Sequence, residues 1–465
     1  MFLDKSTHVM VIGDIMLDHQ RNVEIRSIAN EAPIPVYKFI SENYSLGGSG
    51  NVVKNMHALG CSIDVFGVIG SDANGTKINE LLSSMLGVTS YLQTLSNYPT
   101  SIKERTFCDN KIMFRCDHEE INPNINITLL LQQIEARLKE KHVSIIVLSD
   151  YNKGVLNHDV CQAIINLSTL YGVPTCVDPK KNCLKYKGCT IIKPNWNEAC
   201  SLLNLPKDTS IEDVHKQLFQ ETGCCYSVIT LAERGITLFD GIKLYHEQPT
   251  IQHQLIDVTG AGDIVCSIIA CYLLTNKHDI SNVLRIATSI ATRSVEYPGT
   301  YTIQKRDIIT CDLYGTKHIR TDQIHWIREL YHDKKIVFTN GCFDILHHGH
   351  IQLFNFCHQK GDIIVVGVNS DDSIRRLKGE KRPINPLHLR IGVLESIAFI
   401  NHIIVFKDDS PYSILQMLRP DVIIKGADYQ IKDIIGREFA SEIYICPLVP
   451  DISSTLIIKS CSINK

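Results

Sequence analysis

The 465-residue sequence contains no apolar run that approaches the length of a membrane-spanning helix. Such a helix needs about 18 consecutive apolar residues. The apolar stretch at residues 8–13 is too short and too early in the chain for a secretory signal peptide. We therefore expect a cytoplasmic protein with no membrane partner.

The sequence also lacks an excess of charge of one sign. Its 47 Lys and Arg residues nearly balance 50 Asp and Glu residues, which gives a formal net charge of −3. A balanced chain has no bulk electrostatic attraction to nucleic acid or anionic lipid, so we expect no nucleic-acid partner. The length favours at least two domains.

Two common metal motifs are absent. None of the 17 cysteines forms a C-x-x-C pair, and no H-E-x-x-H sequence occurs. The spacing gives no indication of a zinc or disulfide framework. Reduced, mostly buried thiols in a cytosolic enzyme are the expectation. The sequence has no internal repeat and no low-complexity tract.

Short β-branched runs alternate with helix-patterned segments along the first 310 residues. Strands apolar on both faces and separated by helices predict a parallel sheet covered on both sides. The expected strands are Val9–Gly13, Val65–Gly70, Ser144–Ser149, Thr175–Val177, Thr190–Ile192 and Val228–Leu231. Residues 15–45 and 91–117 are more polar and alternating, which predicts a small accessory sheet or lid over the site.

The alternation lapses near residue 312 and then restarts. The apolar stripe of Ile324, Ile327, Leu330 and Tyr331 predicts a helix capped by Thr321 or Asp322. Further strands are expected at Lys335–Thr339, Asp362–Asn369, Ile403–Phe406, Val422–Lys425 and Ile443–Cys446. We therefore predict an α/β domain at 1–315, a linker and helix at 316–333, and a second α/β domain at 334–465.

The most informative motif of the first domain is the segment 257–263, Asp-Val-Thr-Gly-Ala-Gly-Asp. Its two glycines permit close approach to an anion, and the helix expected from Ile264 would aim free N–H groups at that anion. An acidic side chain at Asp263 needs a reason there. It could take the proton from a hydroxyl that attacks a γ-phosphoryl group, or it could only cap the helix.

Other strand ends carry polar groups with similar alternatives. Asp14 and Asp18 could accept protons of sugar hydroxyls or serve turn chemistry, and Gly47-Gly48-Ser49-Gly50-Asn51 could approach a ligand or give a flexible helix entry. Lys103, Arg105 and Arg115 could hold an anionic group or be solvated charges. The sequence 195–198, Asn-Trp-Asn-Glu, could organise Mg²⁺ with its waters and phosphates, or form a capping box.

The order of these motifs resembles that of the ribokinase-like, PfkB-type sugar kinases over about residues 5–310. The resemblance implies a three-layer α/β domain with a small β-sheet lid, and it makes Asp263 the general base. It implies an anion hole from the N–H groups of Gly260, Ala261 and Gly262. Further ATP-binding residues would be Asn195, Trp196, Asn197 and Glu198, with Mg²⁺ held near Asn195 and Glu198 through the ATP phosphates and without tight direct protein ligands. Sugar-binding residues would be Asp14, Asp18, Gly47, Gly48, Asn51, Lys103 and Arg105.

The second domain carries three histidines in four residues, in the sequence 347–350, His-His-Gly-His. His347 and His350 can face one pocket at a helix N-terminus and stabilise charge on a five-coordinate α-phosphorus. A zinc site would need a third ligand and a general base, and a purely structural pair is the other alternative. Arg375, Arg376, Lys378 and Arg382 predict a mobile basic loop or ordinary solvated surface. Arg390 opens a helix. Residues 452–455, Ile-Ser-Ser-Thr, could offer hydroxyls and N–H groups to a ligand at the start of the last helix or only cap it.

This half resembles the cytidylyltransferase-like nucleotidyltransferases over about residues 334–460, which implies a Rossmann-like HxGH domain. By the resemblance, His347 and His350 stabilise the α-phosphoryl transition state. Lys378 and Arg390 would bind phosphates, and Ser453, Ser454 and Thr455 would close on the nucleotide. Thr339, Asn340, Gly341 and Phe343 would complete the nucleotide site.

Together the halves resemble the bifunctional heptose kinase/adenylyltransferases of Gram-negative bacteria. Segments 31–36, 148–154 and 376–386 carry this closer likeness. The resemblance implies ATP-dependent phosphorylation of D-glycero-β-D-manno-heptose 7-phosphate at C1. After a separate phosphatase has acted, AMP would be transferred to the heptose 1-phosphate, which yields ADP-heptose for the lipopolysaccharide core. It also implies ATP and Mg²⁺ as requirements and a homodimer formed through the kinase domain.

Two departures from the expected pattern are Gly50 and Ala427, at positions where Ala and Gly are expected. A second glycine could loosen the sugar site, and alanine tolerates positive φ poorly. Neither touches Asp263 or the histidines, so both activities are expected to be intact. The rival hypotheses are a cytidylyltransferase acting on another sugar or polyol phosphate, which ATP and CTP would distinguish, and a non-catalytic sensor.

Overall fold

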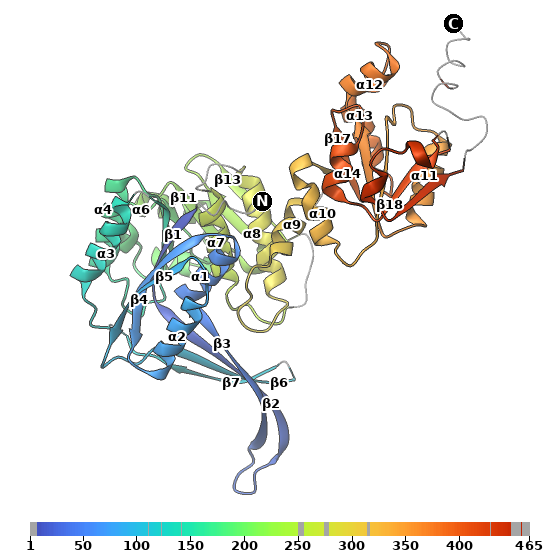
Figure 1. The fold of residues 1–465 in the computed structure, drawn as a ribbon. Coiled ribbons are helices and arrows are strands. Elements are labelled where there is room, and N and C mark those ends of the chain that lie inside the picture. Colours follow the sequence, from blue (N-terminus) through green and yellow to red (C-terminus); the bar gives the residue numbers. More distant parts are fainter. Residues whose placement is uncertain are drawn as a thin grey trace. The chain divides into compact units, whose positions relative to one another are not determined.

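The computed structural model describes residues 7–109, 111–121, 123–140, 142–249, 255–273, 279–313, 317–427, 429–447 and 457. The chain divides into two compact units, Met1–Cys311 and Asp312–Lys465 (Figure 1). In the described ranges, no helix combines the length and apolar character that crossing a bilayer requires. The cysteines of these ranges are free thiols, most of them buried, as the composition predicted.

The first unit is built on a nine-stranded sheet with the order β13-β12-β11-β10-β9-β8-β1-β4-β5. Each apolar run predicted as a strand takes part in it. The strands are β1 His8–Gly13, β4 Ser62–Gly70, β5 Val88–Leu95, β8 Val143–Ser149, β9 Thr175–Asp178, β10 Ile191–Ile192, β11 Tyr226–Thr230, β12 Ile236–Phe239 and β13 Leu244–Glu247.

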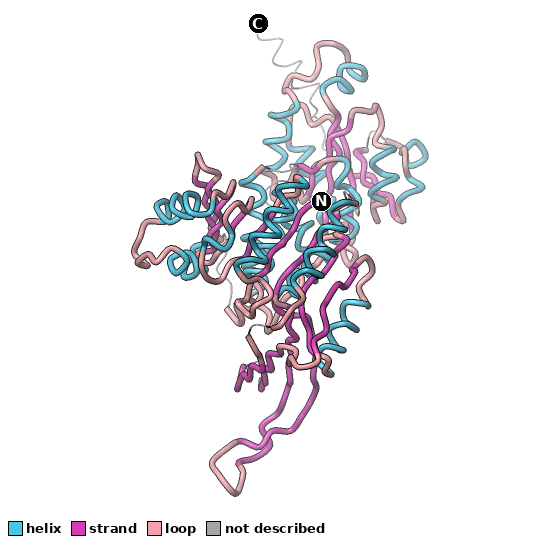
Figure 2. The backbone as a smooth tube through the Cα atoms, turned by 90° about the vertical axis from the view of Figure 1, so that its left-hand side faces the viewer, coloured by secondary structure: helices cyan, strands magenta, loops and turns pink. Residues whose placement is uncertain are grey.

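Helices cover both faces of this sheet, as Figure 2 shows. In β1, Val9 and Val11 enter one core and Met10 and Ile12 enter the other, because successive side chains of a strand point to opposite faces. The first core is packed by α1 Ser49–Ala58, α2 Ala73–Ser83, α7 Ala261–Leu273, α8 Ile280–Ser294 and α9 Lys305–Leu313. The second is packed by α3 Ile127–Lys139, α4 His158–Tyr171, α5 Trp196–Leu202 and α6 Ile211–Thr222. The predicted three-layer α/β architecture is confirmed.

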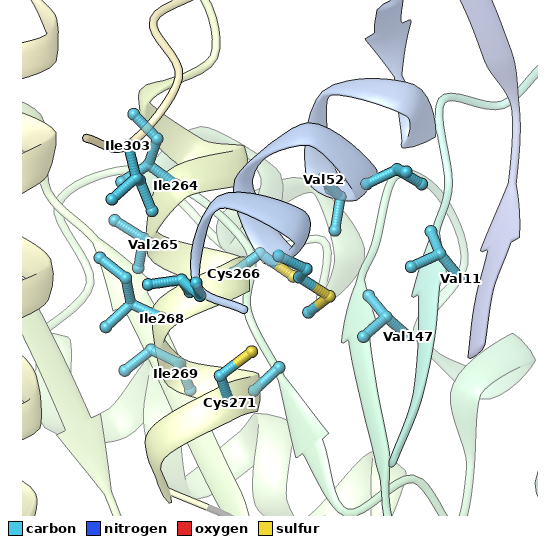
Figure 3. Packing of buried hydrophobic residues seen from close by; sticks show 14 of the residues in the cluster. Val11, Val52, Val147, Ile264, Val265, Cys266, Ile268, Ile269, Cys271 and Ile303 are labelled. Atoms are coloured by element: carbon cyan, nitrogen blue, oxygen red, sulfur yellow. The ribbon is translucent and has the colours of Figure 1, made fainter. Parts of the chain in front are cut away.

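Helix α7 is the central helix of the first core. Ile264, Val265 and Ile268 are all buried, since a helix that is apolar on nearly every side has no face suited to water. Figure 3 shows α7 beside Val52 of α1 and facing strands β1 and β8. This packing fixes the start of α7, where Asp263 lies.

The strands predicted for the main sheet pair in parallel, but two further strands at one edge were not predicted. Strands β12 and β13 pair antiparallel, β12 with β11 and β13 with β12. At the other edge, residues 91–95 belong to β5 of this sheet and not to the lid. Both differences concern strands at or next to an edge of the main sheet, where the local sequence does not reveal which strand pairs with which.

The lid is a separate four-stranded sheet with the order β3-β2-β6-β7. Its strands are β2 Ile15–Ile28, β3 Pro35–Gly48, β6 Ile102–Cys108 and β7 Lys111–His118. The β2–β3 hairpin is buried where it leaves the main sheet and exposed towards its tip, and it projects from the first unit in Figures 1 and 2.

The second unit contains a six-stranded sheet with the order β14-β17-β16-β15-β18-β19, in which all neighbours are parallel. The strands are β14 His318–Ile319, β15 Ile336–Gly341, β16 Ile363–Asn369, β17 His402–Phe406, β18 Val422–Gly426 and β19 Glu442–Cys446. The helices are α10 Ile324–Leu330, α11 His348–His358, α12 Asp371–Lys378, α13 Leu387–Glu395 and α14 Tyr412–Leu418. The segment 316–333 contains the expected helix and also supplies β14, which the sequence analysis did not anticipate.

Five short 3₁₀ helices complete the described elements of the two units. They are η1 Cys183–Tyr186, η2 Ala232–Arg234, η3 Thr321–Gln323, η4 Ile431–Asp433 and η5 Arg437–Phe439.

Candidate active sites

The first candidate site lies where the chain reverses its direction of travel across the main sheet, between β1 and β8. Ligands of open α/β sheets bind at such a point, beyond the carboxyl ends of the strands. Asp14 follows β1, and its carboxylate accepts N–H bonds from Tyr151, Lys153 and Val155 at 2.9, 3.0 and 3.2 Å. Burial is the main cause that raises the pKa of Asp14. The structure therefore uses Asp14 to hold the loop after β8.

Asp263 is the third residue of α7 and is 5% exposed. Asn51 Nδ2 donates to its Oδ2 at 2.7 Å, and the Tyr151 hydroxyl donates to its Oδ1 at 2.7 Å. Burial raises the pKa of this carboxyl, and the two hydrogen bonds oppose the rise. The described hydrogen bonds of the carboxylate come from side chains of other elements, so Asp263 does not serve as the helix cap considered above.

The backbone before Asp263 forms a cradle with room for an anion. Gly260 has φ +84°, and a Cβ there would lie 2.6 Å from Asn51 Nδ2, so only glycine fits both the conformation and the space. The N–H groups of the first helical turn have no partner within the helix. Asp257 holds the loop by accepting bonds from Thr259 N and Gly299 N at 2.9 and 3.0 Å.

A buried lysine adds positive charge beneath this cradle. Lys193 is 2% exposed, and a Cβ on Gly262 would lie 3.6 Å from its Nζ. Burial alone would lower the pKa of Lys193, but its ion pair with Asp178, 3.1 Å away, outweighs burial and raises it. Burial raises the pKa of Asp178 to about 7. We infer a protonated lysine at the helix start, which favours bound phosphate.

Asn195 and Glu198 form the capping box considered above for 195–198. Asn195 Oδ1 accepts from Glu198 N, and Glu198 Oε2 accepts from Asn195 N, both at 2.9 Å. Glu198 Oε1 is paired with Lys180. With both carboxylate oxygens already bonded, Glu198 fits a magnesium ion held through water and phosphate better than a direct ligand. The guanidinium carbon of Arg234 lies over the Trp196 ring, 5.7 Å from the ring centre. Asn197 is exposed.

The lid meets the site through a buried ion pair. Arg105 Nη1 donates to Asp18 Oδ1 at 3.0 Å. A Cβ on Gly47 would lie 2.6 Å from Asp18 Oδ2, so the glycine gives that oxygen its space. Lys103 Nζ lies 5.3 Å from the centre of the Tyr151 ring. Residues from the lid and the main sheet therefore converge here as predicted, whereas Arg115 is paired with Asp117 on the outer strand of the lid.

The glycine-rich entry to α1 is tightly packed. Gly48 has φ +59°, and a Cβ there would lie 2.4 Å from the Asp14 carbonyl oxygen. At Gly50 a Cβ would lie 2.9 Å from Leu46 Cβ and 3.2 Å from Ile15 Cγ1. Leu46 and Ile15 thus occupy the space that an alanine methyl group would need at position 50. Because Gly50 is packed against them, the loosening of the sugar site that was considered above is not expected.

Three further residues of this site were missed by the sequence analysis. Tyr151 and Lys193 were given no role. Lys193 directly follows strand β10, and Tyr151 is the second residue after strand β8. Lys54 was also missed; its Nζ donates to Thr300 Oγ1 at 3.2 Å. Burial lowers the pKa of Lys54, and the nearby carboxylates of Asp18 and Asp263 oppose that change.

The second candidate site lies between β15 and β18, where the strand order of the second unit reverses. Lys425 Nζ of β18 donates to Asn340 Oδ1 of β15 at 2.5 Å. Thr339 is buried, and its hydroxyl finds no hydrogen-bond partner within the described part of the chain. The end of β15 therefore presents polar groups at the place where a nucleotide is expected.

His347 and His350 stand together at the start of α11. Their rings are stacked with centroids 3.9 Å apart, and the buried Nδ1 atom of each has no hydrogen-bond partner among the residues that the structure describes. Burial lowers the pKa of both, that of His350 to about 4, with His347 and Lys378 adding to the effect. Phe343, at φ +47°, packs edge-on against His350, and Gly341 leaves room for the Phe343 ring.

Asp344 ties this motif to the loop before α13. Its carboxylate accepts from Arg382 Nε at 2.6 Å and from the N–H groups of Ile384 and Asn385 at 3.0 and 2.8 Å. Burial would raise the pKa of Asp344, but these bonds outweigh it and lower the pKa. This loop anchor was not recognised in the sequence.

Arg390 is placed differently from the phosphate-binding role that the resemblance implied. It is 2% exposed. Its guanidinium donates to Asn385 O at 3.1 Å, to Cys342 O at 2.7 Å and to Asp371 Oδ1 at 2.7 Å. With each of its three nitrogens bonded to protein, Arg390 braces the loops around the histidines.

The remaining residues expected around the nucleotide are Lys378, Ser453, Ser454 and Thr455, with Ala427 nearby in sequence to Lys425. Arg375, Arg376 and Lys378 lie in the last turn of α12 and not in the predicted loop. Lys378 is exposed there, so its ammonium is accessible to a phosphate. Ser453, Ser454 and Thr455 lie outside the described residues. Ala427 does not have a positive φ, so the backbone strain expected there does not arise.

Family comparisons match each half of the chain. Residues 6–306 match the pfkB family of carbohydrate kinases, and residues 338–460 match the cytidylyltransferase-like family. The chain is 36% identical to the bifunctional protein HldE of Campylobacter curvus, over 98% of both chains. It is 37% identical to that of Campylobacter concisus, over 98% of this chain and 97% of the relative.

Solved structures resemble the kinase unit in fold. Phosphofructokinase-2 from Escherichia coli aligns with a TM-score of 0.55 at 17% identity, over 66% of this chain and 98% of that one. Ribokinase from Arabidopsis thaliana aligns with a TM-score of 0.52 at 19% identity, over the same shares. At this level of identity the likeness supports the ribokinase-like fold.

Proposed function

The chain belongs to the family of the bifunctional HldE proteins, and we propose that it catalyses two separate steps towards ADP-heptose. The kinase unit phosphorylates C1 of D-glycero-β-D-manno-heptose 7-phosphate with ATP. The second unit transfers AMP from ATP to D-glycero-β-D-manno-heptose 1-phosphate and releases pyrophosphate. The observation that carries the proposal is the presence of a buried carboxylate at an anion cradle in one unit and a neutral histidine pair in the other.

In the kinase reaction, Asp263 accepts the proton of the C1 hydroxyl. The freed oxygen forms a bond with the γ-phosphorus while the bond to the β-phosphate oxygen breaks and ADP leaves. The N–H groups of Gly260, Ala261 and Gly262 stabilise the transferring phosphoryl oxygens, and Lys193 lies beneath them. The 2.7 Å bonds from Asn51 and Tyr151 keep the carboxylate aimed at the sugar. The lid residues Lys103 and Arg105 bind and enclose the sugar.

In the nucleotidyl transfer, a phosphate oxygen of the sugar attacks the α-phosphorus of ATP, and the bond to pyrophosphate breaks. His347 and His350 donate hydrogen bonds to the α-phosphoryl oxygens as negative charge grows there. Their lowered pKa values make them neutral near pH 7, so each ring carries one N–H. Lys378 contributes its charge to the leaving phosphates.

The proposal includes Mg²⁺ with both nucleotides, because its charge neutralises the phosphate oxygens. Glu198 would hold the waters around that ion in the kinase unit, because its own oxygens are bonded to Asn195 N and Lys180. Since both reactions consume ATP, we propose the cytoplasm as their compartment.

Product analysis with defined substrates tests the proposed reactions. The full chain is given ATP and heptose 7-phosphate, and separately heptose 1-phosphate with ATP or CTP. We expect heptose 1,7-bisphosphate in the first reaction and ADP-heptose in the second, with little CDP-heptose. A product formed mainly with CTP, or only with another sugar or polyol phosphate, would favour the rival cytidylyltransferase.

We also propose that two chains associate through the lid. The β2–β3 hairpin and β7 expose large apolar side chains, and contiguous exposed apolar surface typically marks an interface. They are Ile25, Ile28, Ile34, Val36, Phe39, Ile40, Ile112, Met113 and Phe114. A paired lid would cover these side chains.

Sedimentation velocity of matched variants tests the lid dimer. Phe39 is 58% exposed on the hairpin, and Leu170 is 73% exposed on α4. Phe39→Asp is expected to convert a dimer to a monomer, because an interface cannot bury an unpaired charge at low cost. Leu170→Asp serves as the control and should remain dimeric. A wild-type monomer, or a dimer that survives Phe39→Asp, would contradict the lid interface.

A further inference from the structure

The face of the lid that is turned away from the kinase site carries a cluster of Glu104, Cys116 and His118. In β6, Lys103 and Arg105 face Tyr151 and Asp18, so the intervening Glu104 points to the opposite face. Cys116 lies directly across from Glu104 in the register of β6 and β7. His118 is two residues further along β7 and therefore shares that face.

The donor atoms of the three side chains have the spacing of a metal site. Cys116 Sγ lies 3.4 Å from His118 Nε2, and the same nitrogen lies 3.5 Å from Glu104 Oε2. All three donors fall within 4.8 Å of one another. Zinc bonds of about 2.0–2.3 Å at tetrahedral angles require donors about 3.3–3.6 Å apart. Two of the pairs already meet that requirement.

Glu104 is held in position by a second layer of contacts. Its other oxygen, Oε1, accepts from His19 Nδ1 at 3.0 Å and from Arg21 Nη2 at 3.1 Å. His19 is 1% exposed, and its remaining ring nitrogen is 2.8 Å from Glu42 Oε2. Oε2 is thereby left turned towards His118. Such hydrogen bonds orient ligating carboxylates in zinc sites.

We propose that Glu104, Cys116 and His118 bind a zinc ion on the outer face of the lid. On binding, the Cys116 thiol releases its proton to solvent and the thiolate sulfur, the His118 nitrogen and a Glu104 oxygen coordinate the ion. His118 has a side chain that is 60% exposed, which leaves the fourth position to water. The ion joins β6 to β7 and so stiffens the sheet whose other face carries Lys103 and Arg105.

Metal titration of the full chain tests the site. Protein freed of metal by a chelator is titrated with Zn²⁺ against a chromophoric competitor, and with Co²⁺ to observe the thiolate-to-cobalt absorption. We expect one site per chain with that absorption. Cys116→Ser and His118→Ala should each weaken zinc binding at least about tenfold, because even partners outside the coordination shell contribute that much.

Matched variants separate this site from other thiols and histidines. Cys225 is exposed elsewhere in the kinase unit, and Cys342 belongs to the histidine motif of the second unit. Cys225→Ser, Cys342→Ser and His350→Ala should all retain the cobalt–thiolate absorption. Circular dichroism of each variant establishes that it is folded. Unchanged zinc affinity in folded Cys116→Ser, or cobalt binding without thiolate absorption, would mean that these contacts are only a hydrogen bond and an ion pair.

Discussion

The carboxylate of Asp263 is held by two donors that come from distant parts of the kinase unit. Asn51 is 212 residues away in sequence and Tyr151 is 112 residues away. Both hydrogen bonds stabilise the ionised form, against the burial that raises the pKa of Asp263. The balance matters because only the ionised carboxylate can accept the sugar proton.

Removal of the Tyr151 hydroxyl tests this balance. In Tyr151→Phe the pKa of Asp263 should rise, so the acid limb of the kinase pH profile should move to higher pH. The value of kcat should fall roughly tenfold, since a hydrogen bond to a charged group contributes about 1.5–3 kcal/mol. Tyr171→Phe, which removes a surface bond to Glu135, is the control. An unchanged acid limb would separate Tyr151 from the base.

For the histidine pair, burial lowers the pKa, whereas it raises the pKa of Asp263. Burial, His347 and Lys378 lower the pKa of His350 to about 4, so the ring becomes charged only when the pH falls through that value. An NMR titration of His350 in the nucleotide-free protein should give a midpoint near pH 4. A midpoint near the ordinary value of about 6.5 would contradict the buried, neutral pair.

At the residue scale, the sequence analysis found the candidate residues that lie in contiguous motifs. It missed those that reach the site only because distant segments pack together. Asp263, His347 and His350 lie in short segments whose spacing itself suggests the chemistry. Tyr151 reaches Asp263 only because β8 and α7 pack together. The roles of Lys54 and Lys193 depend likewise on distant partners, Thr300 and Asp178.

At the scale of elements, the second site depends on braces between loops. Asp344 fixes the loop 382–385 to the segment before α11, and Arg390 of α13 joins Cys342, Asn385 and Asp371. A buried guanidinium with three partners contributes rigidity that a flexible ammonium cannot reproduce. We therefore expect Arg390 to position the loops around the histidines and not to bind phosphate.

A conservative change distinguishes this brace from a phosphate ligand. Arg390→Lys should lower the free energy of unfolding of the second unit by about 2–3 kcal/mol, because two or more buried bonds are lost. Arg437→Lys, at an exposed arginine, should leave stability unchanged. Both are measured by denaturant unfolding without nucleotide. Unchanged stability together with a raised KM for ATP would instead favour direct phosphate contact by Arg390.

The sequence predicted buried strands better than edge strands. Runs that are apolar on both faces can only lie inside a covered sheet, and β1, β4, β8 and β16 are found close to their expected ranges. β5 and β13 are the edge strands of the main sheet, β12 lies next to β13, and β14 has only two residues. For such strands the partner and direction depend on tertiary packing, which local pattern does not contain.

At the scale of the whole molecule, the two chemistries occupy separate compact units. Each unit has its own sheet, its own reversal of strand order and its own hydrophobic core. The carboxylate of Asp263 is bonded to Asn51 and Tyr151 of the first unit, whereas the histidine rings pack on each other and on Phe343 of the second unit. We therefore expect two activities that can be lost one at a time.

The most direct test is the pair Asp263→Asn and His350→Ala in the full chain, with both activities measured on each variant. Asp263→Asn should abolish formation of heptose 1,7-bisphosphate and leave ADP-heptose formation at the wild-type rate. His350→Ala should do the reverse, with at least a hundredfold loss of nucleotidyl transfer, on the order of the loss of one transition-state donor. If either folded variant lost both activities, the two sites would not be independent and the account would be wrong.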